Sequence, residues 1–353
     1  MINKKNWQLM KKYLDYRLSV DQITTGSLNR EKTHMRYVLL WAEERSFRQA
    51  PGFRPTFPEY SLSNRLDGEE GNLSAVYIKK NMATARLFFS WLSDNEEGYR
   101  SIKQAWIKTI KVKRLSDPPK VKDAVTLEEI RNIADSPART LKERRARAAA
   151  VFLYLSGMRI GAFVSLPVQA VDIPNRRVTQ YPSLGVRTKN RKFGITFLLE
   201  LPELLDVVIE WDNEIRAVLP PNGFWFAPIS PKTGKVDANV TSIGEHRSTI
   251  ARRNIKTWLD SVGLRYHSPH KFRHGHIHYG TANARTIEDF KAVSMNAMHS
   301  SMKITDEFYS NLNDGEVEKR IASIGKGMLS ENDNAEAINL FKEFLVWKQN
   351  LKK

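Results

Sequence analysis

Six residues whose side chains can act on a phosphodiester occur in order between positions 159 and 309. A tyrosine oxygen can attack phosphorus, and fixed cations can stabilise the negative charge that develops on the phosphate. Arginine suits that task because its planar guanidinium binds two oxygens at once and keeps its charge. The six are Arg159, Lys189, His270, Arg273, His299 and Tyr309. Together they indicate phosphodiester cleavage with tyrosine as the nucleophile.

The two arginines, Arg159 and Arg273, are expected to clamp the reacting phosphate. His270 and Arg273 are three residues apart, a spacing that places both on one face of a helix. The phenol of a tyrosine has a reference pKa of about 10, so it needs help to lose its proton. His270 is the first candidate for accepting the proton of Tyr309.

The other cations are assigned to the leaving group and to the DNA backbone. The departing 5′ oxygen needs a proton, and Lys189 at a hairpin tip is expected to deliver it. His299 is expected to hydrogen-bond the phosphate. Arg187, Arg191 and Lys192 are expected to bind DNA, and a shifted hairpin would make one of them the acid instead. No metal or other cofactor is required, because side chains supply the cations.

The bulk composition favours a polyanionic partner, which we take to be double-stranded DNA. Lys plus Arg total 56 against 39 Asp plus Glu, giving a net charge of +17 and a pI near 9.8. The chain has no cysteine, which excludes disulfides, thiolate catalysis and cysteine-ligated zinc. The N-terminus lacks the apolar core of a secretion signal, and no run of about 18 apolar residues occurs. We therefore expect a soluble cytoplasmic, nucleoid-associated protein, or one of the host cytoplasm if viral, without a membrane partner.

Composition divides the chain into three parts. Residues 1–115 are expected to form a helical DNA-binding domain, and residues 125–353 a catalytic domain that contains the six residues above. Between them, residues 116–124 are rich in lysine and contain a pair of prolines, which predicts an extended basic linker. Lys120 and Lys122 are expected to follow the phosphate backbone.

Apolar residues at helical spacing mark the first domain, and the aromatics among them are assigned to its core. Residues 48–71, rich in proline and glycine, are expected to form a long loop. The three stripes are Trp7, Met10 and Leu14; Met35, Val38, Leu39 and Ala42; and Ile78, Met82, Ala85, Phe89 and Leu92.

Capping signals mark the start of the second domain. Thr126 and Glu129 form a capping box that opens a helix. Ser136 suits the N-cap of the next helix, which Gly157 is expected to end. Arg159 would then lie at a corner between two helices, where a long side chain can point inward.

Three short segments have the β-rich composition of a small antiparallel sheet, namely residues 176–181, 185–189 and 192–199. Lys189 would lie near the turn that joins the last two strands. From residue 249 onward the pattern is helical again. The expected fold is mostly α with a small antiparallel β-sheet, an α+β arrangement.

The region 125–311 resembles the catalytic domain of the tyrosine recombinase, or phage integrase, family. SGMRIG is similar to the family's TGLRISE-like turn, TKNRKFG to its GKGNKER-like hairpin, HKFRH to HxLRH and AMHSS to LGHSS. Tyr309 follows His299 by ten residues, where the family has its nucleophile after nine or ten. The chain departs from the pattern at Ala162, where an acidic residue is usual, and at Met298, which replaces the glycine of LGH.

The resemblance implies site-specific recombination through a 3′-phosphotyrosyl link and a Holliday junction. It also implies a homo-tetramer on two DNA sites, with C-terminal segments exchanged in a ring. The amphipathic segment 335–353 is accordingly expected to dock on a neighbouring protomer. One helical domain takes up the N-terminal third, which leaves no room for a separate arm-site module.

Two other classes of function remain open. A type IB topoisomerase or a hairpin-forming resolvase would share the tyrosine chemistry without exchange between paired sites. A catalytically silent relative would bind DNA without forming a covalent product. A zinc site at His270 and His274 is disfavoured because the chain has neither an HExxH glutamate nor a cysteine.

Overall fold

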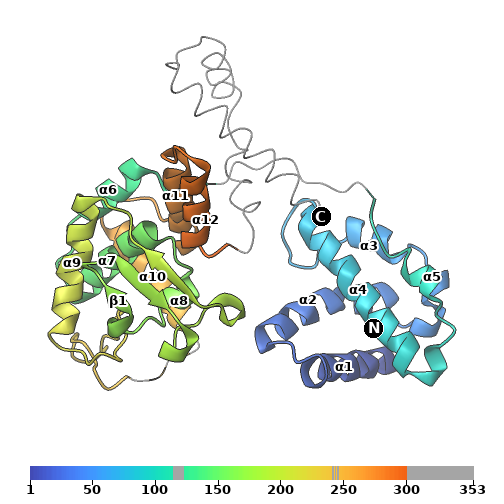
Figure 1. Ribbon diagram of the computed structural model, residues 1–353. Coiled ribbons are helices and arrows are strands. Elements are labelled where there is room, and N and C mark those ends of the chain that lie inside the picture. The colour runs from blue at the N-terminus through green and yellow to red at the C-terminus, as the bar shows by residue number, and fades with distance from the viewer. Residues whose placement is uncertain (114–122, 241, 243, 245, 300–353) are drawn as a thin grey trace, which may run out of the picture. The chain divides into compact units, whose positions relative to one another are not determined.

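The computed structural model describes residues 1–113, 123–240, 242, 244 and 246–299. The chain divides into two compact units, Met1–Lys120 and Val121–Lys353, which we call the N-terminal and C-terminal units. The fold is mostly helical with one small antiparallel sheet, as the sequence predicts. Figure 1 labels the elements of both units.

The N-terminal unit is a helical domain packed around aromatic side chains. Its principal helices begin after side-chain caps: Asn3, Thr24 and Ser74 each accept hydrogen bonds from the first turn of the helix that follows. Trp41, Phe88 and Phe89 are among its buried rings. The elements are α1 (Lys4–Ser19), α2 (Thr25–Ala42), η1 (Phe47–Gly52), α3 (Phe57–Ser63), α4 (Ala75–Asn95), η2 (Glu97–Tyr99) and α5 (Gln104–Ile107), where η denotes a 3₁₀ helix.

The apolar stripes predicted for this unit lie in α1, α2 and α4, and all but one of their residues are buried. Trp7 is the exception. It is 43% exposed, with the ammonium of Lys11 5.5 Å from its ring. The loop expected over residues 48–71 was also only partly correct, because Thr56 and Glu59 form a capping box that starts α3. A proline in the first turn of that helix is compatible with helical structure.

The C-terminal unit is built around α7, which packs against α6, α9, α10 and α11. Eleven of the sixteen residues of α7 are buried, so this helix is the centre of the core. The helices are α6 (Leu127–Asp135), α7 (Leu141–Ser156), α8 (Ile160–Phe163), α9 (Pro202–Arg216), α10 (Arg247–Ser261), α11 (Pro269–Ala282) and α12 (Ile287–Asn296), with η3 (Val168–Ala170), η4 (Pro182–Leu184) and η5 (Lys189–Arg191) between them.

The start of α7 differs from the prediction. The capping box of α6, Thr126 with Glu129, is confirmed. Ser136, however, is the C-cap of α6 rather than the N-cap of α7. Thr140 takes that position, because Glu143 completes a capping box with it. A reciprocal pair of hydrogen bonds at residues 140–143 outweighs the single cap that Ser136 offers.

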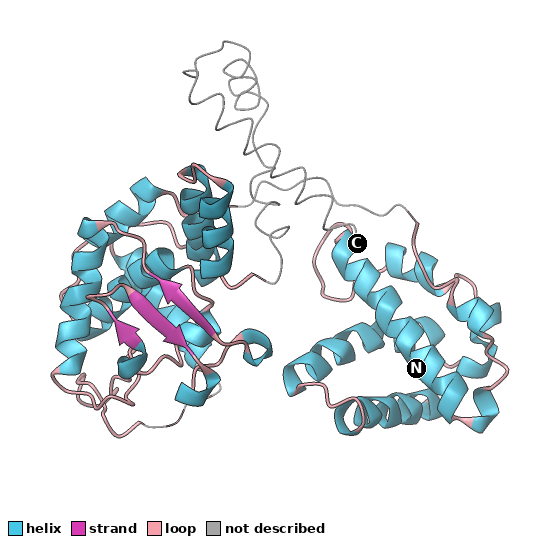
Figure 2. Cartoon of the chain, viewed as in Figure 1, coloured by secondary structure: helices cyan, strands magenta, loops and turns pink. Residues whose placement is uncertain are grey.

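The sheet has three antiparallel strands in the order β1 (Val171–Asp172), β2 (Arg177–Gln180) and β3 (Gly194–Phe197). Figure 2 shows it among the helices of this unit. The strand expected at 185–189 does not form. Val186 is instead buried, and the N–H of Arg187 donates to Oγ of Ser165 at 2.8 Å, so this segment packs beside α8. A long connection, residues 181–193, therefore replaces the predicted tight hairpin.

Candidate active site

The corner between α7 and α8 positions Arg159, as the sequence predicts. Gly157 ends α7 with a φ of +61°, in the left-handed region that favours glycine. A Cβ at this position would also lie 2.5 Å from Cδ2 of His276. Arg159 follows as the N-cap residue of α8 and is partly buried, which lowers the pKa of its guanidinium.

Arg273 on α11 joins three segments of the unit. Its side chain is buried, with 3% of the residue exposed. Nη1 donates to the carbonyl of Gly157, and Nη2 donates to the carbonyl of Ala297. Burial and then the charge of Arg159 lower the pKa of Arg273 to about 9. The guanidinium is therefore still positive at neutral pH, and it lies near a second one.

His299 lies just beyond α12, and its backbone N–H donates to the carbonyl of Ser294 at 3.1 Å. Burial and the neighbouring positive groups lower the pKa of its imidazole to about 4. In decreasing order of effect these groups are Arg273, Arg159, His274 and His270. We call the five residues Arg159, His270, Arg273, His274 and His299 the cationic cluster. The structure thus brings together four of the six predicted catalytic residues.

Met298, the residue before His299, has a φ of +51°. Glycine adopts this conformation without strain, which accounts physically for the glycine of the LGH motif. A methionine pays roughly 1 kcal/mol for the same turn. Its side chain packs against Gly194 at the start of β3, where an added Cβ would lie 2.7 Å from Cε of Met298. The substitution therefore keeps the turn that presents His299.

His270 and His274 are one helical turn apart on α11, and their ring centroids are 4.3 Å apart. His270 is exposed and Arg273 is buried, so the helix presents a histidine at the surface and a guanidinium beneath it. His274 adds a further imidazole to which sequence reasoning assigned no catalytic role. Among the residues described, no three of the His, Asp and Glu side chains converge as a metal site would require.

His276 and Asn296 support the cluster, and sequence reasoning missed both. Nδ1 of the buried His276 lies 2.9 Å from the carbonyl of Tyr154, and Nε2 lies 3.2 Å from Nδ2 of Asn296. A carbonyl only accepts and an amide NH₂ only donates, so the neutral ring carries its proton on Nδ1. Burial lowers the pKa of His276 to about 4, which keeps the ring neutral. The spacing of Arg273 and His276, three residues on one helix, was the available signal.

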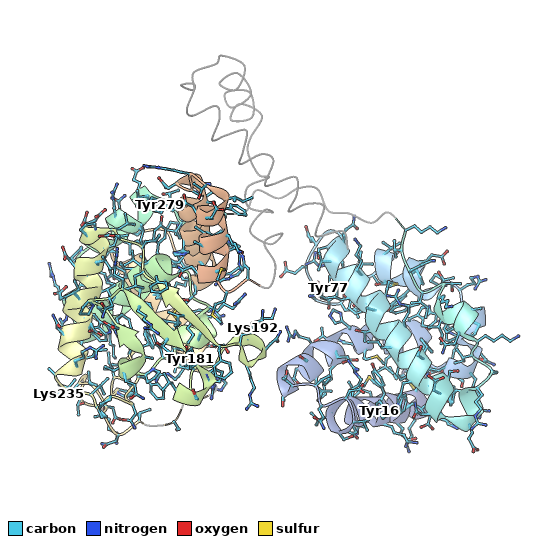
Figure 3. All side chains as sticks on the ribbon, in the orientation of Figure 1. Tyr16, Tyr77, Tyr181, Lys192, Lys235 and Tyr279 are labelled. Carbon is cyan, nitrogen blue, oxygen red and sulfur yellow. The ribbon has the colours of Figure 1, made fainter. Side chains whose placement is uncertain are left out.

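Lys189 lies on the connection between β2 and β3, where its side chain is exposed. Arg187, Arg191 and Lys192 are exposed on the same connection. Lys192, labelled in Figure 3 at the rim of the unit, lines a hollow that His299 also lines. Lys192 is therefore placed beside a member of the cluster.

Three predicted functional residues lie outside the described residues, namely Tyr309, Lys120 and Lys122. The same holds for the C-terminal segment 335–353. Across the described part of the chain, no helix combines the length and the apolar character needed to cross a membrane.

Comparison with solved structures places this fold among DNA recombinases and integrases. A XerH site-specific recombinase bound to a palindromic difH substrate matches with a TM-score of 0.58 and 15% identity, over 90% of this chain and 84% of that one. A lambda integrase dimer bound to a core site matches with a TM-score of 0.56 and 12% identity, over 85% of this chain and 94% of that one. A Tn1549 transposon integrase in complex with a circular intermediate DNA matches with a TM-score of 0.55 and 14% identity, over 92% of this chain and 100% of that one.

No protein-family model matches the sequence, and no curated protein matches it. The chain nevertheless has the tyrosine recombinase fold. At 12–15% identity the likeness is one of fold.

Proposed function

We propose that this protein is a site-specific DNA recombinase that cleaves and rejoins strands through Tyr309. The observation that carries the proposal is the cationic cluster. Two guanidinium groups and three imidazoles gather where α11 packs against α7 and α12. Burial, and after it the positive charge of these neighbours, lowers the pKa of Arg273 and of His299. A phosphodiester bound there would replace this repulsion by attraction, most strongly as charge builds on the phosphate in the transition state.

In the first step the oxygen of Tyr309 attacks phosphorus, and the bond between phosphorus and the 5′ oxygen breaks. The phenol proton goes to His270, which is exposed at the edge of the cluster. The 5′ oxygen takes a proton from Lys189, or from Lys192, and leaves as a hydroxyl. Arg159 and Arg273 hold the non-bridging oxygens.

In the second step the 5′-hydroxyl of a partner strand attacks the 3′-phosphotyrosyl link and releases the tyrosine. Each phosphodiester is thus exchanged for a phosphotyrosine of similar energy, and no nucleotide cofactor is consumed. Two such exchanges, carried out on two DNA sites by a homo-tetramer, pass through a Holliday junction.

DNA binding by both units follows from this proposal. The XerH, lambda and Tn1549 proteins were all solved with DNA, and their likeness to this chain supports the same partner here. Residues 1–115 would be the core-binding domain, and residues 116–124 a linker in which Lys120 and Lys122 follow the backbone. Such a protein acts where the DNA is, in the cytoplasm at the nucleoid.

A covalent adduct tests the proposal. Candidate duplexes taken from the DNA that flanks the gene, with a nick that lets the cleaved end diffuse away, should trap a denaturant-resistant protein–DNA adduct, and Tyr309→Phe should form none. An equal adduct yield from Tyr309→Phe would falsify the assignment of the nucleophile. A protein that binds DNA without forming an adduct would be the catalytically silent relative, and relaxation of any supercoiled plasmid would indicate a topoisomerase.

A further inference from the structure

Asp123 forms two ion pairs that join the start of the C-terminal unit to α11. Its Oδ2 accepts a hydrogen bond from Nη2 of Arg265 at 2.8 Å, and another from Nζ of Lys271. We call these two ion pairs the linker anchor, because Asp123 belongs to the segment 116–124 proposed above as the linker. Lys271 lies in the first turn of α11, directly after His270. The anchor therefore acts on the turn that carries His270.

Backbone and side-chain contacts beside the anchor hold the same two segments together. The N–H of Val125 donates to the carbonyl of Lys271 at 3.2 Å. Nε2 of the buried His267 lies 3.0 Å from Oε1 of Glu129. One turn further along α11, Gly275 has no room for a Cβ, because the carbonyl of Val125 lies against it. The segment after the linker thus crosses the first half of α11 in close contact.

The N-terminus of α11 has no acidic partner of its own. Its N-cap residue, Ser268, makes no side-chain cap hydrogen bond, and its first turn contains no acidic residue. By contrast, α6, α7 and α12 each begin with a capping box. Lys271 adds a positive charge at the end of α11 where the helix dipole disfavours one. Asp123 supplies the missing negative charge from a different segment.

We propose that Asp123 is a positioning residue that fixes the first turn of α11, through Lys271, so that His270 can take the proton of Tyr309. The side chains of Asp123 and Lys271 are 36% and 33% exposed, and a partly exposed ion pair adds little to the stability of a whole protein. A displaced catalytic group, however, slows a reaction steeply. We therefore expect the anchor to affect the rate of cleavage more than the stability. This role rests on the function proposed above.

The anchor should matter more for His270 than for Arg273, although both lie on α11. Arg273 is buried and is also held by the carbonyls of Gly157 and Ala297. His270 is exposed and lies in the same turn as the anchored Lys271. Loss of the anchor should therefore slow the chemical step while binding of the phosphate is kept.

Substitution of Asp123 tests the positioning role. Asp123→Asn removes the charge, and we expect adduct formation in a single turnover at saturating protein to slow about 10-fold. DNA binding should be no weaker, and urea unfolding should be close to that of the wild type. Asp123→Glu keeps the charge and should restore most of the rate. A wild-type rate for Asp123→Asn, or a loss that Asp123→Glu does not repair, overturns the proposal.

The matched control breaks a different ion pair of the same unit. Nε of Arg131 lies 2.8 Å from Oε1 of Glu203, and both side chains are exposed. Glu203→Gln removes a carboxylate from that pair as Asp123→Asn does from the anchor, and it should form the adduct at the wild-type rate. An equal slowing by Glu203→Gln would show a general effect of lost charge and overturn the proposal.

A double-mutant cycle tests whether Asp123 acts through Lys271. Residues that act as one unit have rate losses that do not multiply. Asp123→Asn combined with Lys271→Met should therefore be no slower than the slower of the two single variants. Losses that multiply in the double variant would overturn the proposed route.

Amide hydrogen exchange tests the anchor without DNA. In Asp123→Asn the peptide 265–275 should exchange faster than in the wild type, and in Glu203→Gln it should not. Equal exchange in the wild type and Asp123→Asn overturns the anchor. If exchange responds as expected but the wild type forms no adduct with DNA, the anchor is kept and the recombinase function is rejected. If the wild type forms the adduct and Asp123→Asn does so equally fast, the function is kept and the positioning role is rejected.

Discussion

Arg145 and Arg247 form one pair of arginines within the C-terminal unit, and Arg159 and Arg273 form another. The guanidinium of Arg145 lies 4.4 Å from the ring centroid of Phe226, and that of Arg247 lies 4.5 Å from the centroid of Phe224. Both also donate to backbone carbonyls. Burial, and after it the charge of a neighbouring arginine, lowers the pKa of each to about 10. The neighbour is Arg247 for Arg145 and Arg187 for Arg247. This pair is stabilised by aromatic faces and carbonyls of its own unit.

Arg273 also donates to carbonyls, but its neighbours are Arg159 and histidines of the cationic cluster. Burial of a guanidinium is therefore not by itself a sign of function. What distinguishes the second pair is the group of three histidines beside it, because a bound anion would favour the protonated imidazoles and relieve the repulsion between the two guanidinium groups.

Replacement of Arg273 should give the largest effect. Arg273→Ala removes one of the two donors to the non-bridging oxygens, and loss of one such donor typically costs about 10²- to 10³-fold in rate. We expect single-turnover adduct formation to fall by that factor, measured on the nicked duplex at saturating protein. A variant that cleaves at the wild-type rate would place the phosphate elsewhere.

Low pH should reduce the stability of the folded protein through His276, the buried histidine that supports the cationic cluster. The neutral ring of His276 has its pKa lowered to about 4 in the folded protein, against about 6.5 when unfolded. Below the unfolded value the unfolded chain binds a proton that the folded chain does not, so stability falls as pH drops from about 6.5 to 4, by roughly 3 kcal/mol. Urea unfolding at several pH values should show this decline. His276→Gln should show a smaller decline in stability. An identical pH dependence in the variant would contradict the assignment of this decline to His276.

Replacement of Arg145 should separate stability from chemistry. Arg145→Met leaves the carbonyl of Ala227 without its donor, and an unsatisfied buried acceptor costs about 1–3 kcal/mol. We expect a lower free energy of unfolding, while adduct formation per folded molecule stays at the wild-type rate. If Arg145→Met instead lost cleavage while remaining folded, Arg145 and Arg247 could not be distinguished in role from Arg159 and Arg273.

The exposed cations of the β2–β3 connection should have a smaller, salt-dependent effect. Removing one phosphate contact changes the slope of log affinity against log salt concentration by about 1. Arg191→Gln and Lys192→Gln should each do so in DNA-binding titrations. Lys235→Gln is the control, because Lys235 is also exposed and lies at the opposite edge of the unit in Figure 3. If the Arg191, Lys192 and Lys235 variants all have the same salt slope, the β2–β3 connection does not contact the DNA backbone.

Local signals in the sequence predicted much of this arrangement. The capping box at Thr126, the glycine that ends α7 and the three-residue spacing of His270 and Arg273 each depend on neighbours along the chain. Those features act within one turn of helix, so composition and spacing reveal them. The helical content and the presence of a small antiparallel sheet follow in the same way.

What the sequence did not reveal depends on contacts between distant segments. The segment 185–189 has strand-like composition, yet Oγ of Ser165 takes the N–H that a strand would have paired. Asn296 supports both His276 and β3, contacts that span 20 and 99 residues. Ser136 has a residue type suited to an N-cap, and only the reciprocal bonds of Thr140 and Glu143 decide against it.

The pKa of His299 measures most directly whether a DNA phosphate completes the cluster. In the free protein it lies near 4, because burial and four positive or protonatable neighbours oppose protonation. Histidine NMR titrations with and without a duplex carrying the cleaved site should show it rising above the ordinary value of about 6.5 when DNA is bound. The rise should be smaller in Arg273→Ala, where the phosphate is held less firmly. A pKa that stays near 4 in the DNA complex would contradict the account.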